Sequence, residues 1–372
     1  MKIAFVCFYR VFPPTFGSAA LTYQFFQNLR AEKLLIQIDT PRNKQSLAEG
    51  TPVFNLCTWS HRWYVKWVFI LIQIPVVVRL LQTNRPDTII IEGGSWVVYA
   101  ALAFASLSHA RVKAKVIYHA HNVEYLLRKK KNNILIACVT RWAEGYVMRH
   151  ADTIVAVSSI DAAHFQRLYQ IQAQVNLPAV SLDTFAKVTP AQINSVCRRY
   201  GYNGNSVLFM GLQAYKPNRQ ALDFLISQVF PQVLRSIPDA QLVVIGGKVL
   251  PRRSWLVNPG IVPFEDMPAL ISSAAVCTAP VFSGSGVRIK ILEYMAAARP
   301  VVATTKAKEG LLVSDGEDIY LADSAVQFAE KIVYVLRNEE PARKIGRAAR
   351  ETIALHYDGN NIKNRGLLHL WS

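Results

Sequence analysis

Short apolar runs rich in β-branched residues recur along the chain, with helical patterns between them. In the first half they stand at 2–8, 34–39, 87–93, 114–121 and 152–158. Runs this short and continuous are typical of parallel strands that are buried on both faces of a sheet. The series begins again and comprises 206–212, 240–247, 260–264, 274–281, 300–304 and 319–323. The repetition predicts an α/β protein of two doubly wound, Rossmann-like domains that face a central cleft.

The length of 372 residues agrees with two domains. We expect them at 1–180 and 190–350, because the segment 175–192 has two prolines and weak periodicity. A C-terminal helix is expected within 351–372, packed back on the first domain. The opening apolar run is interrupted by Arg10 and is too short for a secretory signal, so it predicts a strand. Five cysteines without a CxxC pair indicate a reduced, cytoplasmic compartment and no zinc site.

The chain carries a formal net charge of +17. Residues 1–190 hold 21 Lys and Arg against 10 Asp and Glu, and residues 191–372 hold 21 against 15. The excess in the first half favours an anionic partner, which could be anionic lipid, nucleic acid or a phosphate-bearing substrate. Charge that only keeps the protein dissolved is the alternative. We expect no nucleic-acid partner, because the chain has no recognisable nucleic-acid-binding motif.

Residues 64–81 are unusually apolar, but the uninterrupted run from Trp67 to Val78 is too short to span a bilayer. Aromatic and basic residues flank the run, as in helices that lie at a membrane surface. A core helix of the first domain is the alternative. The same domain contains a basic run at 128–131. With the charge excess, these features favour a peripheral location at the anionic inner face of the membrane.

A turn of small residues, Gly284-Ser285-Gly286, runs from a predicted strand into a helix that should begin near Arg288. Glycines let an anion approach the backbone, and the free N–H groups at a helix start attract it. The turn therefore predicts a diphosphate site, with a tight connection as the alternative. Glu293 lies at the edge of the apolar helix face, among small residues. Its carboxylate could bind two vicinal hydroxyls, as on a ribose, although a solvent-facing glutamate is the alternative.

The stretch GSGVRIKILEYMAAARPVVATTKAKEGL resembles the retaining glycosyltransferases of family four, which have the two-domain GT-B fold. Other segments agree with this family in order and spacing. Residues 118–128 resemble its acceptor-side histidine segment, and 151–161 its last strand of the first domain. Residues 207–225 and 230–247 resemble the opening of its nucleotide-binding domain. The likeness covers most of the chain and is thin between 40 and 85.

The resemblance implies roles residue by residue. Glu293 would hold the nucleotide ribose, and His121, with His119 as the alternative, would lie near the transferred sugar. Arg288 and Lys290 match a subgroup with basic residues after the glycine turn. The implied donor-binding residues are Gly17, Lys216, Arg219, Gly284, Ser285, Gly286, Val287, Arg288, Lys290 and Glu293; Lys216 would also assist catalysis, and backbone groups of Val262 and Pro263 would hold the base.

Two positions depart from the family pattern. Ser285 stands where the family has its first glutamate, and we interpret this as a variation in sugar contacts. Ala298 stands where the family has a glycine before the next strand, and alanine suits a left-handed helix cap poorly.

The resemblance implies an enzyme that moves a sugar from a UDP- or GDP-sugar to a saccharide or lipid-linked acceptor, in cell-surface polysaccharide or glycan synthesis. Helix N–H groups and basic side chains would stabilise the diphosphate as it leaves. No cluster with metal-ligand spacing is visible in the sequence, so we expect no metal and no other cofactor. The alternative is a catalytically silent GT-B scaffold that binds nucleotide or a protein partner, and Ser285 is its main support.

Overall fold

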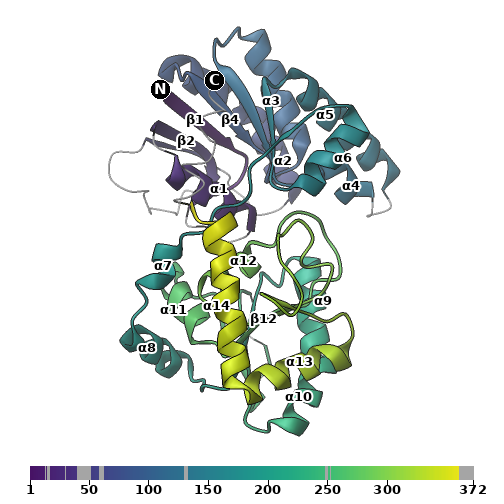
Figure 1. Ribbon diagram of the computed structural model, residues 1–372. Coiled ribbons are helices and arrows are strands. Elements are labelled where there is room, and N and C mark those ends of the chain that lie inside the picture. Colours follow the sequence, from purple (N-terminus) through teal and green to yellow (C-terminus); the bar gives the residue numbers. More distant parts are fainter. Residues whose placement is uncertain are drawn as a thin grey trace. The chain divides into compact units, whose positions relative to one another are not determined.

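The computed structural model describes residues 1–12, 14, 17–29, 31–39, 52–57, 63–129, 133–247, 250–251 and 253–359. The chain forms two compact units (Figure 1). The first comprises Met1–Pro178 together with Ser285–Val287, and the second comprises the other described residues from Ala179 onward. Each unit has its own parallel sheet. The prediction of two Rossmann-like α/β units is therefore confirmed.

The first unit is built on a seven-stranded sheet in the order β3-β2-β1-β4-β5-β6-β7. Every pairing in it is parallel. The strands are β1 (Lys2–Cys7), β2 (Glu32–Asp39), β3 (Val53–Cys57), β4 (Thr88–Glu92), β5 (Lys115–Ala120), β6 (Thr153–Ala156) and β7 (Gln174–Val175). Each apolar run predicted in this half contains a strand. The sequence analysis missed β3 and β7, which are edge strands with exposed polar residues such as Asn55 and Gln174.

Helices cover both faces of this sheet, as buried parallel strands require. They are α1 (Gly17–Asn28), α2 (Trp63–Asn84), α3 (Val97–His109), α4 (Glu124–Lys129), α5 (Ile134–His150) and α6 (Ser159–Tyr169). Phe5 of β1 packs against Phe25 and Phe26 of α1, with ring centroids 5.8 and 4.9 Å apart. Ala4 and Val6 point to the other face and join a core with residues of α2, α3 and α5. Those three helices lie side by side (Figure 1).

Helix α2 contains the apolar segment 64–81. Ile70, Ile74, Val77 and Leu81 are buried at helical spacing. Three large apolar residues on its outer side are exposed: Leu71, Ile72 and Val76. The side chains of 63–69, which include the aromatic end of the predicted membrane-surface segment, lie outside the described residues. The described part of the segment is thus a core helix with an apolar outer side.

The second unit is built on a six-stranded sheet in the order β10-β9-β8-β11-β12-β13, again with parallel pairings throughout. The strands are β8 (Ser206–Met210), β9 (Gln241–Ile245), β10 (Leu256–Gly260), β11 (Val276–Ala279), β12 (Val301–Ala303) and β13 (Tyr320–Leu321). The predicted strand at 260–264 is wrong, because β10 ends at Gly260, where φ is +77°. The sequence analysis missed β10 because Asn258 and Pro259 are uncommon in strands. The strand tolerates Pro259 because β10 lies at the edge of the sheet.

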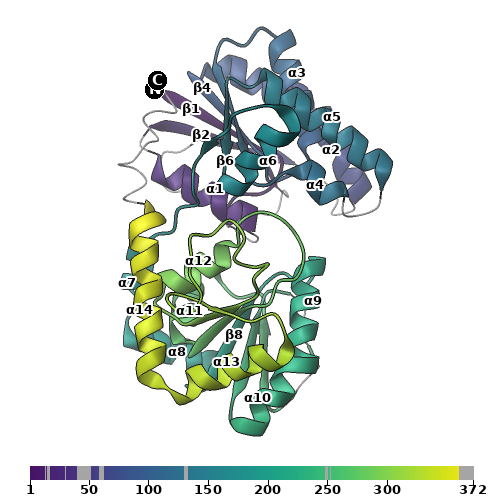
Figure 2. The ribbon, with the colours of Figure 1, turned by 45° about the vertical axis from the view of Figure 1, so that its right-hand side comes forward.

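The helices of the second unit are α7 (Leu182–Ala186), α8 (Pro190–Tyr200), α9 (Lys216–Phe224), α10 (Phe230–Ser236), α11 (Met267–Ser273), α12 (Ile289–Ala296), α13 (Ala325–Arg337) and α14 (Glu339–His356). A π-helical turn, Leu225–Val229, joins α9 to α10. Figure 2 shows α9, α10 and α13 on one side of the sheet and α8, α11 and α14 on the other. Phe230 of α10 and Phe328 of α13 belong to the core that covers β8 and β9.

The last described residues return to the start of the second unit. Helix α14 runs from Glu339 to His356, so 351–356 are its last turns. After it, the Val180 N–H donates to the Tyr357 carbonyl at 2.8 Å, and the Gly359 N–H donates to the Val180 carbonyl at 3.1 Å. The rest of the predicted C-terminal segment, 360–372, lies outside the described residues.

Helix α12 ends on a left-handed residue that is not glycine. Ala298 has a φ of +55°. Its N–H donates to the Met295 carbonyl at 2.9 Å, and the Arg299 N–H donates to the Tyr294 carbonyl at 3.1 Å. These two bonds form a Schellman helix end, in which a side chain at the left-handed position is strained. Gly346 of α14 packs against this end, and a Cβ at Gly346 would collide with the Ala298 carbonyl oxygen.

Ala298→Gly should therefore stabilise the protein by about 1 kcal/mol, because glycine adopts the left-handed conformation without strain. Gly346→Ala is the matched control and should destabilise the protein, since its methyl group meets the Ala298 carbonyl. Chemical denaturation measures both free energies of unfolding. A lower stability of Ala298→Gly would contradict the strained cap.

Candidate functional site

In both sheets the strand order reverses next to the first strand, between β1 and β4 and between β8 and β11. At such a reversal the connecting loops part, and the carboxyl ends of the strands become open to a ligand. The predicted residues gather at these ends. Gly17 follows β1, His119 and His121 lie at the end of β5, Lys216 follows β8, and 284–293 follow β11.

The loop between β11 and α12 has the open backbone that the sequence predicts. Gly284 and Gly286 have φ of +106° and +80°, which L side chains rarely adopt. A Cβ at Gly284 would also lie 3.2 Å from the Tyr215 hydroxyl oxygen. Helix α12 begins at Ile289, and the side chain of Arg288 does not cap it. A turn free of Cβ atoms at two positions thus leads into a helix start, which suits an anion.

Lys290 reaches from α12 to the carboxyl end of β8. Its Nζ donates to the Met210 carbonyl at 2.5 Å and to Oδ1 of Asn218 at 3.1 Å. The same Nζ lies 4.9 Å from the ring centroid of Phe209. Burial lowers the pKa of Lys290 to about 7, and the positive charge of Arg288 adds to this effect. Lys290 therefore ties α12 to β8, a structural role that the sequence analysis missed.

Glu293 lies on the same helix and is half-buried. Burial raises the pKa of its carboxyl to about 7, against the attraction of Lys290. The residues that the structure describes give this carboxylate no hydrogen bond. A partly desolvated carboxylate without donors costs free energy in the unliganded protein. That cost is characteristic of groups that bind a polar ligand, rather than of an ordinary solvent-facing glutamate.

The basic residues after β8 stand at the start of α9. Lys216 is the first residue of that helix and Arg219 lies in its first turn, and both side chains are exposed. Exposure is compatible with anion binding and with ordinary surface charge. Val262 and Pro263 follow β10 and precede a short 3-10 turn at Phe264–Asp266. Pro263 has no N–H, so only Val262 of this pair offers a backbone donor.

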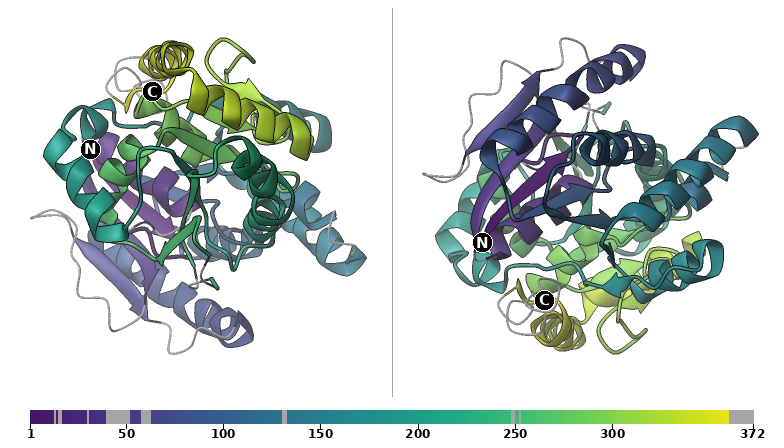
Figure 3. Two further views of the ribbon diagram at one scale, coloured as in Figure 1. Left: turned by 90° about the horizontal axis from the view of Figure 1, so that it is seen from below. Right: turned by 90° about the horizontal axis from the view of Figure 1, so that it is seen from above.

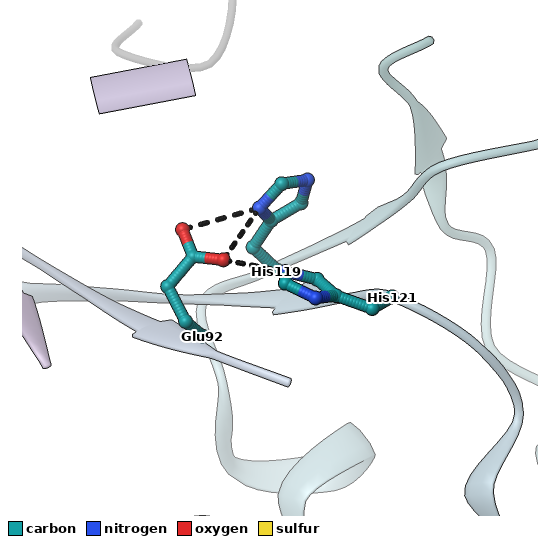
Figure 4. A group of neighbouring side chains, drawn as sticks. All are labelled: Glu92, His119 and His121. Atoms are coloured by element: carbon teal, nitrogen blue, oxygen red, sulfur yellow. Dashed lines mark hydrogen bonds and ion pairs between the residues drawn. The ribbon is translucent and has the colours of Figure 1, made fainter. Parts of the chain in front are cut away.

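In the first unit three titratable side chains meet, as Figure 4 shows. Oε2 of Glu92, at the end of β4, lies 3.0 Å from Nδ1 of His119 and 2.6 Å from Nε2 of His121. The Thr22 hydroxyl of α1 donates to the same oxygen at 2.8 Å. All four side chains are at most 5% exposed. One buried carboxylate oxygen is therefore the centre of three hydrogen bonds.

The charge state of this cluster follows from its surroundings. Burial alone would raise the pKa of Glu92. The two histidines, of which His119 has the larger effect, outweigh burial and hold that pKa well below its ordinary range. Burial lowers the pKa of His121, although Glu92 opposes this. Near pH 7 the carboxylate is thus ionised and His121 is neutral.

Two histidines and a carboxylate could also hold a metal ion, and their ligand atoms lie within 4.8 Å of one another. The separations favour hydrogen bonds. Ligand atoms about 2.0 Å from a tetrahedral zinc ion stand roughly 3.3 Å apart. Nε2 of His121 and Oε2 of Glu92 are only 2.6 Å apart, which is the length of a charge-assisted hydrogen bond. The expected metal independence stays a prediction.

The sequence analysis did not single out Glu92 or Thr22. Residues 87–93 carry one usable signal, an acid at the carboxyl end of a buried strand. Thr22 has no comparable signal, because only the packing of α1 on the sheet brings it to Glu92. Gly17, the first residue of α1, is exposed, and a Cβ there would meet no atom within 4 Å.

Helix α5 carries a surface that the sequence analysis also missed. Ile134 and Leu135 are 78% and 79% exposed, Val139 is 47% exposed and Trp142 is 67% exposed. We call these four residues the α5 surface. Figure 3 shows the start of α5 at the periphery of the first unit. Helix α4, which packs on α5, ends with basic residues at 128–129. Exposed apolar side chains gathered in this way mark an interaction surface.

Two family models match the chain. The model of Glycosyltransferase Family 4 matches residues 17–178, and that of Glycosyl transferases group 1 matches residues 204–338. The putative glycosyltransferase EpsD of Bacillus subtilis is 24% identical over 254 residues, which are 64% of this chain and 65% of EpsD. A phosphatidyl-myo-inositol mannosyltransferase of Mycobacterium tuberculosis is 28% identical over 204 residues, 49% of this chain and 51% of the relative.

Solved structures agree with the observed fold. HepE of Anabaena, in complex with UDP and glucose, has a TM-score of 0.76 and 17% identity, with both chains covered completely. WaaG, a glycosyltransferase involved in lipopolysaccharide biosynthesis, has a TM-score of 0.70 and 15% identity, with 98% of each chain covered. Both have the GT-B fold, so the predicted fold class is confirmed. The chain spans about half to two thirds of the length of the curated relatives it matches.

The raised pKa of Glu293 predicts a stability that falls as the pH rises. Between its ordinary pKa of 4.5 and about 7, the folded carboxyl keeps a proton that the unfolded chain has released. The free energy of unfolding therefore decreases across this window. Glu293→Gln cannot ionise and should be more stable than the wild type by about 1 kcal/mol at pH 8, once solvent screening is allowed for. Thermal unfolding at pH 4.5 and 8 measures the difference.

Glu351→Gln, at an exposed position of α14, is the control and should match the wild type at both pH values. Equal stabilities of Glu293→Gln and the wild type at pH 8 would show that Glu293 is an ordinary solvent-facing residue.

Proposed function

We propose that this chain, which belongs to the group 1 glycosyltransferases, transfers a sugar from a nucleotide-diphosphate sugar to a lipid-linked or other saccharide acceptor, with retention at the anomeric carbon. The supporting observation is the Glu293 carboxylate, which is half-buried and receives no hydrogen bond from the described residues. A ribose has the two vicinal hydroxyls that such a carboxylate accepts. A diphosphate is the anion that suits the neighbouring glycine turn and helix start.

The proposed donor lies along the carboxyl edge of the second sheet. Glu293 binds the ribose, the turn 284–287 and Arg288 bind the diphosphate, and the Val262 backbone contacts the base. Lys216 and Arg219 add positive charge from the start of α9. UDP- and GDP-sugars both satisfy this arrangement. Because the complexes of HepE contain UDP, a UDP-sugar is the first donor to test.

In the proposed reaction the bond between the anomeric carbon and the diphosphate oxygen breaks. A bond from an acceptor hydroxyl forms on the same face of the sugar, and the hydroxyl proton passes to the leaving diphosphate. N–H groups of α12 and the basic side chains stabilise the charge that develops on the diphosphate. His121 contacts the transferred sugar, and Ser285 replaces a carboxylate contact by a hydroxyl contact. Metal is not required for these steps.

Glu293→Ala should weaken the binding of UDP and GDP at least tenfold, because the ribose loses a charged acceptor of two hydrogen bonds. Isothermal titration calorimetry measures the affinities. Glu351→Ala is the control and should bind as the wild type does. Wild-type affinity in Glu293→Ala would overturn the assignment of the ribose site.

Transfer itself is tested by incubation with a panel of UDP- and GDP-sugars and a bacterial membrane lipid extract. Release of nucleoside diphosphate together with a sugar-bearing lipid supports the proposal. Nucleotide binding without transfer from any donor favours the second candidate, a catalytically silent scaffold. The observation in favour of that candidate is Ser285 at the position of a family glutamate.

The proposed acceptor lies at the anionic inner face of a membrane, which the protein contacts through the α5 surface. Its large apolar side chains suit insertion among lipid headgroups, and Lys129, which is exposed at the end of α4, suits anionic lipids. The mycobacterial relative acts, by its name, on a phospholipid. Among the described residues, none of the helices has both the length and the hydrophobicity that crossing a bilayer requires.

A triple variant of the α5 surface, Ile134→Ser with Leu135→Ser and Trp142→Ala, should lose most of its co-flotation with vesicles of phosphatidylglycerol and phosphatidylcholine. The reason is that each large apolar side chain contributes about 1.5–3 kcal/mol when it is fully buried. The matched control replaces three exposed residues of the second unit: Val326→Ser, Tyr334→Ala and Leu355→Ser. It should float as the wild type does.

Absence of wild-type flotation at low salt would overturn the membrane proposal. If the wild type instead forms a dimer that the triple variant abolishes, the α5 surface mediates self-association.

A further inference from the structure

Each histidine beside Glu92 uses one ring nitrogen to hydrogen-bond the carboxylate, and its second ring nitrogen has no partner among the described residues. Nε2 of His119 and Nδ1 of His121 are buried and have no hydrogen-bond partner among the described residues. An ionised carboxylate only accepts hydrogen bonds, so the ring nitrogens that face it carry protons. These are Nδ1 of His119 and Nε2 of His121. In a neutral imidazole the other nitrogen is then an acceptor. His121, whose imidazole is neutral near pH 7, therefore has the Nε2–H tautomer, and its Nδ1 is an acceptor.

We propose that Glu92, with Thr22 as its support, is a positioning residue that fixes His121 in the Nε2–H tautomer and so presents Nδ1 to a substrate hydroxyl as a hydrogen-bond acceptor. The inference rests on the proposed function, in which His121 contacts the transferred sugar. Glu92 itself does not touch the sugar in this scheme and acts only through His121.

The distances from Nε2 of His121 explain why Glu92, rather than Thr22, sets the tautomer of His121. The Thr22 hydroxyl donates to Oε2 of Glu92 at 2.8 Å, and the Tyr9 hydroxyl lies 2.7 Å from the Thr22 oxygen. Thr22 is 3.4 Å from Nε2 of His121, which is long for a hydrogen bond. Glu92, at 2.6 Å, is the short contact of that nitrogen. Tyr9 and Thr22 thus orient Glu92, and Glu92 orients His121.

Among the groups around Glu92, the two histidines are the ones that keep its carboxylate ionised. Cys7 and Tyr9 come from β1 and the residues after it, and Tyr118 comes from β5. Burial, together with the charge of Glu92, raises the pKa values of all three groups, although Glu144 and Glu124 act more strongly on Tyr118. They are therefore neutral near pH 7 and place no second negative charge beside Glu92. A carboxylate next to Nε2–H polarises the ring and makes Nδ1 a stronger acceptor.

The tautomer can be read directly. In protein labelled with ¹⁵N-histidine, nitrogen-detected NMR distinguishes protonated from unprotonated ring nitrogens, and His121→Asn identifies the signals of His121. At pH 7.5 the wild type should show a protonated Nε2 and an unprotonated Nδ1. Glu92→Leu removes the acceptor and should give a mixture of tautomers. Glu92→Gln keeps an acceptor oxygen, so this conservative variant should restore the wild-type pattern.

With the donor that the nucleotide-sugar panel identifies, the kcat values should rank the variants as the tautomer does: wild type, then Glu92→Gln, then Glu92→Leu. Glu92→Leu should lower kcat at least 100-fold, and Glu92→Gln about tenfold because it keeps the tautomer but loses the charge. KM for the donor should change little in either. The matched control is Glu144→Gln, since Glu144 is a second buried glutamate of this unit and binds the N–H of Glu124 and the Tyr169 hydroxyl. It should leave both kcat and the His121 signals unchanged.

The outcomes separate this inference from the proposed function. A protonated Nδ1 of His121 in the wild type, or an unchanged tautomer in Glu92→Leu, overturns the inference whether or not transfer occurs. Stoichiometric Zn²⁺ binding that removes both ring protons facing Glu92 overturns it as well. If Glu92→Leu does not fold, the wild-type spectrum and the rate of Glu92→Gln still decide. The expected spectra without transfer from any donor support the positioning role and count against the proposed transferase activity.

Discussion

Parallel strands can bury their hydrogen bonds only when helices cover both faces of the sheet, and this constraint organises both units. Each strand must return through a crossover, so the carboxyl ends of all strands in a sheet meet at one edge. The reversal of strand order next to β1 and next to β8 then opens that edge. Residues of the candidate functional site lie at these edges: Glu92 and His121 in the first unit, and Gly284 and Glu293 in the second.

Both glutamates at these edges are desolvated, but only the carboxylate of Glu92 is stabilised by hydrogen bonds. Glu92 accepts hydrogen bonds from Thr22 and two histidines, and its pKa is held low. Glu293 receives no hydrogen bond from the described residues, and burial raises its pKa to about 7. The first carboxylate is satisfied within its own unit. The second is not, and it therefore destabilises the unliganded protein in a way that a polar ligand would relieve.

Much of the fold could be predicted because its signals are local. Runs of buried β-branched residues indicated β1, β4, β8 and β11, and the glycine turn indicated a strand-to-helix connection with an open backbone. Edge strands were harder, since β3 and β10 mix polar residues or proline with apolar ones. The sequence analysis doubted a left-handed cap at Ala298, because alanine suits one poorly, but its φ of +55° shows that the cap is left-handed all the same.

The sequence by itself determined most of the strands away from the sheet edges and where the backbone must lack side chains, because periodicity and residue type act over a few neighbours. Tertiary structure alone decided which side chains meet. Hydropathy could not tell that Ile70 is buried while Ile134 is exposed, because that depends on which helix faces the sheet. Likewise, Glu92 and His121 are 29 positions apart, and only the pairing of β4 with β5 brings their side chains within hydrogen-bond distance.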